Sequence, residues 1–317
     1  MRTYILRRLL QGVAVLFVVS VVVFAIVHAA PGGPALLNQP DMDPNVAREM
    51  RASLGLDDPL PVQYGRWIRN AVAGNFGKSY QHSLPTTQLL RDRIPNTLLL
   101  SGTALVMAVL LAVPLGTISA LYRYSWLDYL ATVIAFAGVS IPVFWLAILM
   151  IIVFSVQLGW LPSAGMVTVG AVFSLRDLVA HLVMPALVLA TFPLAQLTRY
   201  VRSSMVDVLA QDYIRTARAK GLPETALLAR HALRNALIPM LTVLGVLTPR
   251  LLGGAVITET IFAWPGLGRL AVDAAITRDY PVIMSVTLLV SALVVVSNLV
   301  TDLLYGIVDP RISLEAR

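Results

Sequence analysis

The chain has 317 residues, of which 57% are hydrophobic and only 13% are charged. Soluble domains carry about twice that charged fraction, so the composition excludes an ordinary soluble protein and indicates an integral membrane protein. The sequence contains no cysteine, which excludes disulfides, zinc–thiolate sites and iron–sulfur clusters. Its formal net charge of +7 fits either a nucleic-acid partner or the cytoplasmic loops of a membrane protein.

The N-terminus resembles a secretory signal peptide, because Arg7 and Arg8 precede a long apolar run. That run, Leu9–Ala30, is long enough to span a bilayer. Pro31 follows it, and a proline just after the candidate cleavage site is unfavourable for a signal peptidase. We therefore expect an uncleaved first transmembrane helix.

Six apolar segments are long enough to be spans of about twenty residues, which predicts an all-α membrane protein. The third is long enough either to bend near Ser140–Pro142 or to run out past the lipid. The fourth is the weakest because it is short and contains Pro185 and Pro193. The segments are Leu9–Ala30, Asn96–Leu121, Leu127–Leu158, His181–Thr198, Ala236–Phe262 and Val282–Ile307.

The polar stretch between the first two segments, Pro31–Pro95, predicts a small folded external insert with a short helix around Asn45–Leu54. Within it, "GNFGKS" at Gly74–Ser79 looks like the end of a phosphate-binding loop, G-x-x-x-x-G-K-[ST]. Val72 stands where the first glycine is required, and that glycine lets backbone N–H groups curl around phosphates. We interpret the stretch as a glycine-rich turn and not as a nucleotide site.

The basic residues predict the orientation, because cytoplasmic loops carry an excess of Lys and Arg. With the N-terminus inside, the two short external loops hold only Arg176, Arg269 and Arg278. Both termini are therefore expected in the cytoplasm, and the positive charge belongs to the membrane and not to nucleic acid. The predicted cytoplasmic basic residues are Arg2, Arg7, Arg8, Arg123, Arg199, Arg202, Arg215, Arg218, Lys220, Arg230, Arg234, Arg311 and Arg317.

The longest cytoplasmic connection, Arg199–Asn235, predicts a helix, a turn and a second helix. Gly221 can adopt the left-handed conformation that ends a helix, and Pro223 enforces the stop. Glu224 then suits the first turn of the next helix, near its positive end. On local features alone, an ordinary basic surface loop is slightly favoured over a helix that docks on a partner. A DNA-reading helix-turn-helix is disfavoured, because a helix tethered between two spans could hardly reach a groove.

Several short motifs follow one another along the chain. Together, in this order and spacing, they resemble the membrane permease subunits of ATP-binding-cassette importers, specifically the peptide/nickel class and most closely its first-type dipeptide/oligopeptide permeases. The motifs are "APG" at 30–32, "GNFGKSY" at 74–80, "RIPNT" at 93–97, "RYVRSSM" at 199–205, "RTARAKG" at 215–221, "ETIFAWPGLG" at 259–268 and "DPRI" at 309–312.

The sequence departs from the broader family at the pattern E-A-A-x-x-x-G. Ala217 and Gly221 match it, but Arg215 stands in place of the glutamate. The leucine–proline pair that usually follows is displaced, with Leu233-Arg234 at its place and Pro239 further on. These departures are typical of the peptide/nickel class. Gly33, where many relatives have aspartate, has no functional interpretation.

The resemblance implies a type I importer transmembrane domain over residues 1–317, with an external insert at 31–95 and a cytoplasmic coupling segment at 199–235. It implies no cofactor in this chain, since ATP and Mg²⁺ would be bound by two separate cytoplasmic ATPase subunits. The other implied partners are a homologous second permease, an extracytoplasmic binding protein and the lipid of a bacterial inner membrane.

Peptides are the implied cargo, with nickel or another small solute as the alternative. The residues implied in ATPase coupling are Asp212, Tyr213, Arg215, Ala217, Arg218, Ala219, Lys220 and Gly221.

Charges inside predicted spans are costly and therefore suggestive. Arg250, Glu259 and Asp302 are candidates either for the translocation pathway or for structural ion pairs. An ion-driven secondary transporter would need acidic relay residues deep in the spans and an internal repeat, and neither is evident. An intramembrane enzyme would need a nucleophile–base or metal constellation, which the sequence also lacks. No metal site is expected, because the histidines are scattered: His28, His82, His181 and His231.

Overall fold

The computed structural model describes residues 2–31, 33–34, 37 and 42–308, so the motif "DPRI" at 309–312 and Gly32 lie outside the described residues. The described backbone is helical apart from turns, loops and an isolated β-bridge between Lys78 and Pro85. It divides into two compact units, one of residues 1–98 and 264–296 and the other of residues 99–263 and 297–317. The prediction of an all-α fold is confirmed.

Within the part of the chain that the structure describes, four helices are long and apolar enough to cross a membrane, and the number rises to six if each of two bent helix pairs is one span. The first bent pair is α5 (Trp126–Ser140) with α6 (Val143–Met150) and η2 (Ile151–Gln157), and the second runs from Glu224 to Leu251. The four continuous helices are α1 (Arg2–Ala29), α4 (Thr86–Leu121), α7 (Leu175–Leu209) and α12 (Tyr280–Val308).

The bend predicted near Ser140–Pro142 is confirmed, because the axes of the first bent pair differ by 107°. Pro142 caps α6 at its N-terminus, and a proline disfavours the helical conformation of the residue before it. The second pair bends by 45° and comprises α9 (Glu224–Ala226), η3 (Leu227–Leu233) and the beginning of α10 (Arg234–Ile261). η2 and η3 are π-helical, a form that is frequent at functional sites.

The unit of residues 1–98 and 264–296 contains the insert helices α2 (Pro44–Ser53) and α3 (Leu60–Val72), together with α11 (Leu267–Thr277). α2 confirms the predicted short helix, and the Asp43 side chain caps it by accepting from the Asn45 N–H. One core joins side chains of α4, α11 and α12, and a second joins α1 to α12, with Tyr64 and Trp67 of α3 packed against it.

Two stretches that the sequence singled out as motifs meet in this unit. The indole N–H of Trp264 donates to the Asn96 carbonyl at 3.0 Å, and the Asn96 amide donates to the Pro265 carbonyl at 2.8 Å. The Leu267 N–H donates to the Thr97 hydroxyl at 2.8 Å. The "WPGL" turn is therefore fastened to the "PNT" stretch inside α4.

The "GNFGKS" stretch is a turn, as predicted, since Gly74 and Gly77 have φ angles of +80° and +82°. The Ser79 hydroxyl, which would bind Mg²⁺ in a nucleotide loop, instead donates to the buried Asp279 carboxylate at 2.5 Å. The Gln81 N–H donates to the same oxygen at 3.1 Å. The serine therefore secures the turn to the beginning of α12.

α7 is the central helix of the second unit and packs against α5, α6 and α10. It runs well beyond the predicted span His181–Thr198, with Pro185 and Pro193 inside it. A Cβ at Gly116 would lie 2.8 Å from the Thr198 carbonyl oxygen, so glycine is required where α4 crosses α7. Small residues at such crossings let transmembrane helices approach closely.

Candidate functional site

Within the predicted coupling segment, residues 212–219 form a short amphipathic helix, α8 (Asp212–Ala219). Ile214 and Ala217 are buried, and their spacing of three residues places them on one face of the helix. This face packs against η3. Asp212 lies in the first turn and Arg218 in the last, where each charge complements the helix dipole.

The opposite face of α8 and the residues after it are exposed. Ala217 differs from the other coupling candidates, because its side chain is buried within the chain. The exposed candidates are Asp212, Tyr213, Arg215, Arg218, Ala219, Lys220 and Gly221.

α8 ends in the left-handed turn that the sequence predicts, with Gly221 at φ +78°. The Gly221 N–H donates to the Arg218 carbonyl at 3.0 Å and the Leu222 N–H to the Ala217 carbonyl at 3.4 Å. This pair of bonds is a Schellman motif. A Cβ at Gly221 would meet no atom within 4 Å, so within this chain glycine is required by conformation and not by space.

Two side-chain contacts brace the turn from outside. The Arg218 guanidinium donates through Nε to Glu224 Oε1 at 2.7 Å, and this hydrogen bond raises the pKa of Arg218. The Asn235 amide at the beginning of α10 donates to the Tyr213 hydroxyl at 3.1 Å. α8 is thus held by side-chain contacts to α9 and to α10.

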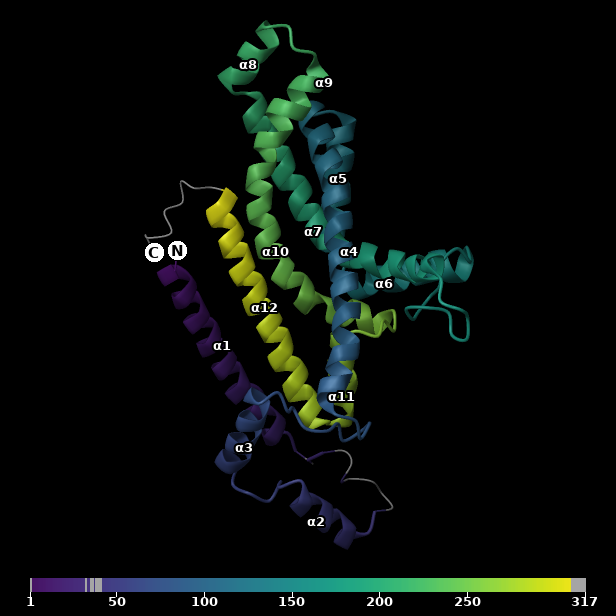
Figure 1. The fold of residues 1–317 in the computed structure, drawn as a ribbon. Helices are drawn as coiled ribbons and strands as arrows, with labels where there is room; N and C mark the ends of the chain where they lie inside the picture. The colour runs from purple at the N-terminus through teal and green to yellow at the C-terminus, as the bar shows by residue number, and fades with distance from the viewer. Residues whose placement is uncertain (1, 32, 35–36, 38–41, 309–317) are drawn as a thin grey trace. The chain divides into compact units, whose positions relative to one another are not determined.

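The position of α8 in the chain suits the transmission of movement. It begins three residues after the end of α7 and continues through the Gly221 turn into α9, η3 and α10 (Figure 1). α7 and α10 pack closely along their lengths. A displacement of α8 would therefore act on two packed membrane helices at once.

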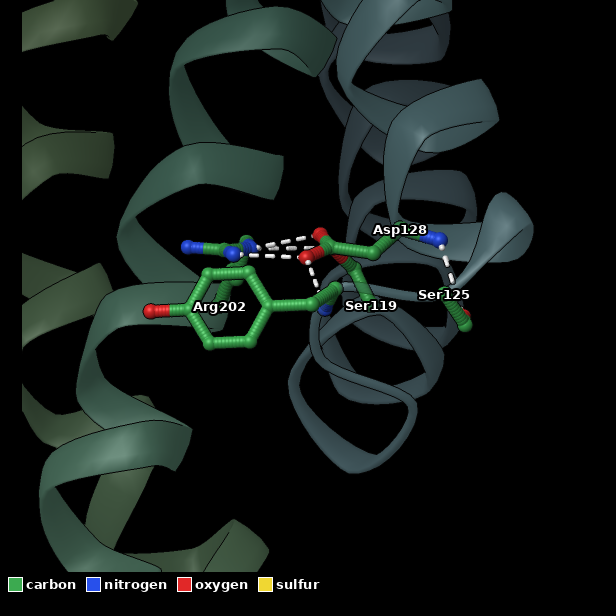
Figure 2. A network of polar contacts seen from close by, with 5 residues as sticks. Ser119, Ser125, Asp128 and Arg202 are labelled. Atoms are coloured by element: carbon green, nitrogen blue, oxygen red, sulfur yellow. Dashed lines mark hydrogen bonds and ion pairs between the residues drawn. The ribbon is translucent and has the colours of Figure 1, made fainter.

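A partly buried ion pair joins α7 to the end of α4 and the beginning of α5 in the same unit (Figure 2). Arg202 of α7 donates through Nε and Nη2 to the two carboxylate oxygens of Asp128 on α5, each at 2.7 Å. Arg202 Nε also donates to the hydroxyl of Ser119 on α4 at 3.1 Å, and that hydroxyl donates to Asp128. The Tyr124 N–H donates to the Asp128 carboxylate at 3.0 Å. These bonds fix the α4–α5 turn to α7.

Sequence reasoning missed this cluster. Asp128 lies at the edge of the predicted span 127–158, and Arg202 is one of the basic residues that predict the orientation. Asp128, a carboxylate just inside an apolar segment, could have indicated the cluster, since a buried charge needs a partner of opposite charge. The partner lies 74 residues away in the chain, which no local pattern reveals.

The three intramembrane candidates lie in different surroundings. Arg250 on α10 is exposed, and its guanidinium lies 4.9 Å from the ring centroid of Phe192 on α7. Glu259, near the end of α10, is fully buried. Asp302 on α12 is half-buried. Among the described residues, no group of three His, Cys, Asp or Glu side chains could hold a metal ion.

Comparisons with known proteins cover almost the whole chain. Residues 112–314 match the family described as Binding-protein-dependent transport system inner membrane component, and residues 1–101 match the N-terminal region of such membrane components. The chain is 47% identical to the oligopeptide transport system permease protein AppB of Bacillus subtilis (strain 168), covering 98% of this chain and 99% of that protein. It is 45% identical to the glutathione transport system permease protein GsiC of Escherichia coli (strain K12), again over 98% of this chain and 99% of the relative.

A solved structure shares the fold. It shows inward-facing conformations of the MetNI methionine ABC transporter, and 70% of this chain matches 97% of its chain with a TM-score of 0.58 and 19% identity. At that identity the likeness concerns the fold alone.

Proposed function

Since the chain belongs to the family of binding-protein-dependent transport system inner membrane components, we propose that it forms half of the translocation pathway of a peptide importer. The resemblance to permeases of ATP-binding-cassette importers is confirmed. The chain is thus a multi-pass permease subunit of the inner membrane, and its family implies ATPase and binding-protein partners.

The finer assembly we propose has a homologous second permease, two cytoplasmic ATPase subunits that bind ATP and Mg²⁺, and one binding protein outside.

We propose peptides as the cargo because two similar permeases are named for peptide substrates. AppB is described as an oligopeptide permease and GsiC as a glutathione permease, and glutathione is itself a small peptide. Both names favour a peptide over nickel or another small solute, the alternative within the same class.

The proposed contact with the ATPase is the exposed face of α8 together with the Gly221 turn. The observation that supports it is the division of α8 into a face packed on η3 and an exposed face that carries polar and charged side chains. A rigid element of this kind can pass a movement of a partner to α7 and α10. Arg215, Arg218 and Lys220 would offer cations to the partner, and Ala219 would allow close approach.

In the proposed orientation both termini and α8 are cytoplasmic, and the insert with α2 and α3 is external. This rests on the distribution of basic residues. The exposed arginine Arg250 would then face a partner or the pathway, since a charge that faced lipid would be costly.

Reconstitution of defined subunits tests the proposal. The chain would be co-purified with candidate ATPases, a second permease and a binding protein, and peptide uptake would be measured in vesicles. Uptake is expected only with ATP and only in the complete complex. Uptake by the chain alone, driven by an ion gradient, would identify a secondary transporter instead. Full activity with two copies of this chain and no second permease would contradict the heteromeric assembly.

A further inference from the structure

A cavity of about 280 Å³ lies beside the Asp128–Arg202 ion pair, between α4, α5 and α7. Its apolar wall consists of alanine and valine side chains of α5 and α7. The volume is slightly below the range of about 300–1,000 Å³ typical of small-molecule sites. It is therefore suited to a headgroup-sized ligand. The polar residues that line it are Ser119, Thr132, Gln196, Thr198, Arg199 and Arg202.

The cavity can hold an anion, because two arginines one helical turn apart line it. Arg202 uses Nε and Nη2 for its bonds, which leaves Nη1 without a hydrogen bond to the described residues. Arg199 is exposed and its one hydrogen bond to a described residue is a 3.2 Å contact from Nη2 to the Gln196 side chain. Asp128 neutralises only Arg202, so the cavity retains the positive charge of Arg199.

A buried hydroxyl supports the same conclusion. Thr198 is only 4% exposed, and its Oγ1 has no hydrogen-bond partner among the described residues. An unsatisfied buried hydroxyl is unfavourable. A rotation about χ1 would let an oxygen ligand in the adjacent cavity satisfy it.

The surroundings of the cavity are those of a membrane–water interface. Exposed aromatic residues lie in and around the α4–α5 turn and, with Tyr200, beside Arg199 on α7, and the Arg123 guanidinium lies 4.6 Å from the Tyr124 ring centroid. Tyrosine and tryptophan gather at the headgroup level of a bilayer. The aromatic residues are Tyr122, Tyr124, Trp126, Tyr129 and Tyr200, which are between 41% and 71% exposed.

We propose that this cavity binds the phosphate group of an anionic phospholipid, with Arg199 and the free Nη1 of Arg202 as its donors. Basic pockets between transmembrane helices at the cytoplasmic side suit anionic lipid headgroups. The alanine and valine wall would contact the glycerol and the first acyl carbons. The proposed orientation is used only to assign the lipid to the inner leaflet, and the binding itself does not depend on it.

Occupancy of the cavity would affect the coupling segment, because Arg202 lies two turns before the end of α7 and α8 follows directly. A lipid phosphate on Arg202 would share the arginine with Asp128 and hold α4, α5 and α7 together. The complex should therefore be more stable to heat in membranes that contain anionic lipid.

Native mass spectrometry of the complex, released from nanodiscs that contain phosphatidylcholine with or without phosphatidylglycerol, tests the site. The wild-type complex should retain phosphatidylglycerol, and Arg199→Gln should retain it about fivefold less, as expected for the loss of one arginine near the membrane surface. Arg8→Gln is the matched control, because it removes the same charge at a residue that does not line the cavity. It should retain phosphatidylglycerol as the wild type does.

Experiments with inorganic phosphate and with peptide cargo distinguish the lipid from these other ligands. Inorganic phosphate added to complexes in phosphatidylcholine should neither bind nor stabilise them, and peptide cargo should not displace phosphatidylglycerol. Equal retention in Arg199→Gln and wild type would overturn the proposal. Tight binding of free phosphate without a preference for the lipid would overturn the lipid assignment, and displacement by peptide would reassign the cavity to the translocation pathway.

Discussion

Asp128 and Arg202 show how much of the local structure rests on two side chains. The Asp128 side chain is 5% exposed and that of Arg202 is 31% exposed, so their interaction lies largely out of water. Removal of one partner from a buried pair leaves an uncompensated charge and costs about 3–5 kcal/mol. Replacement of both can be far less harmful.

Arg202→Gln should therefore lower the apparent melting temperature of the purified permease, and Asp128→Asn should do the same. The double variant should recover part of the loss, because no charge is left unpaired. Thermal unfolding in one detergent at one pH would measure all three. Additive losses in the double variant would mean that the two side chains do not stabilise the fold as a pair.

Glu224 offers a contrasting ion pair on the surface. It contacts Arg218 across the Gly221 turn, but both side chains are more than half exposed. Such exposed pairs contribute little to stability, and the Schellman bonds of the turn do not involve the Glu224 side chain. Glu224→Ala should therefore leave most of the binding-protein-stimulated ATP hydrolysis intact. A complete loss of stimulation would show that Glu224 itself contacts the ATPase.

At the scale of the secondary-structure element, α8 is the feature that links sequence to mechanism. Its two faces differ, since Ile214 and Ala217 are buried where α8 packs on η3, while the exposed side chains form the proposed contact with the ATPase. Because the chain has no cysteine, single cysteines can report on each face without interference.

Lys220→Cys should form a disulfide with a cysteine placed in the docking surface of the ATPase. Ile214→Cys, on the buried face of the same helix, is the matched control and should not. Non-reducing gel electrophoresis of the oxidised complex would measure both. Cross-linking from Ile214→Cys alone would mean that α8 docks through the other face or leaves η3 in the complex.

The elements that depend on local rules were predictable. Apolar length predicted the membrane segments, Pro142 predicted the break after α5, and Gly221 with Pro223 predicted the end of α8. Each of these rests on a residue and its near neighbours in the chain. The full length of α7 was not predictable in this way, because Leu175–Leu209 extends beyond the predicted span His181–Thr198 at both ends, where the charged residues weaken the apolar signal.

The contacts between distant residues could not be predicted from one sequence. Ser79 and Asp279 are 200 residues apart, and Asp128 and Arg202 are 74 apart. In the candidate site, the sequence predicted the helix and its turn but not that Ala217 faces inward. That orientation depends on where η3 lies, which is a property of the folded unit.

For the whole molecule, the orientation in the membrane is the first property to test. The basic residues predict an external Gln81 and a cytoplasmic Glu224, both of which are exposed in the structure. A reporter that is active only outside the cytoplasm should give signal when inserted at Gln81 and none at Glu224. The reverse pattern would invert the topology and place α8 where no cytoplasmic ATPase could reach it.

In the proposed mechanism, movement of the ATPase reaches the membrane helices through the Gly221 turn. A non-glycine residue in the left-handed conformation costs about 1–3 kcal/mol, so Gly221→Val should still reach the membrane while the end of α8 is distorted. Gly170→Val is the matched control, because Gly170 has φ +81° and, as at Gly221, a Cβ there would have no atom within 4 Å.

The most direct measurement is the ATP hydrolysis rate of the reconstituted complex with and without peptide-loaded binding protein, at equal amounts of assembled permease. We expect Gly221→Val to abolish the stimulation and peptide uptake, and Gly170→Val to retain both. Normal stimulation and uptake in a well-assembled Gly221→Val complex would contradict the assignment of α8 as the element that couples ATP hydrolysis to transport.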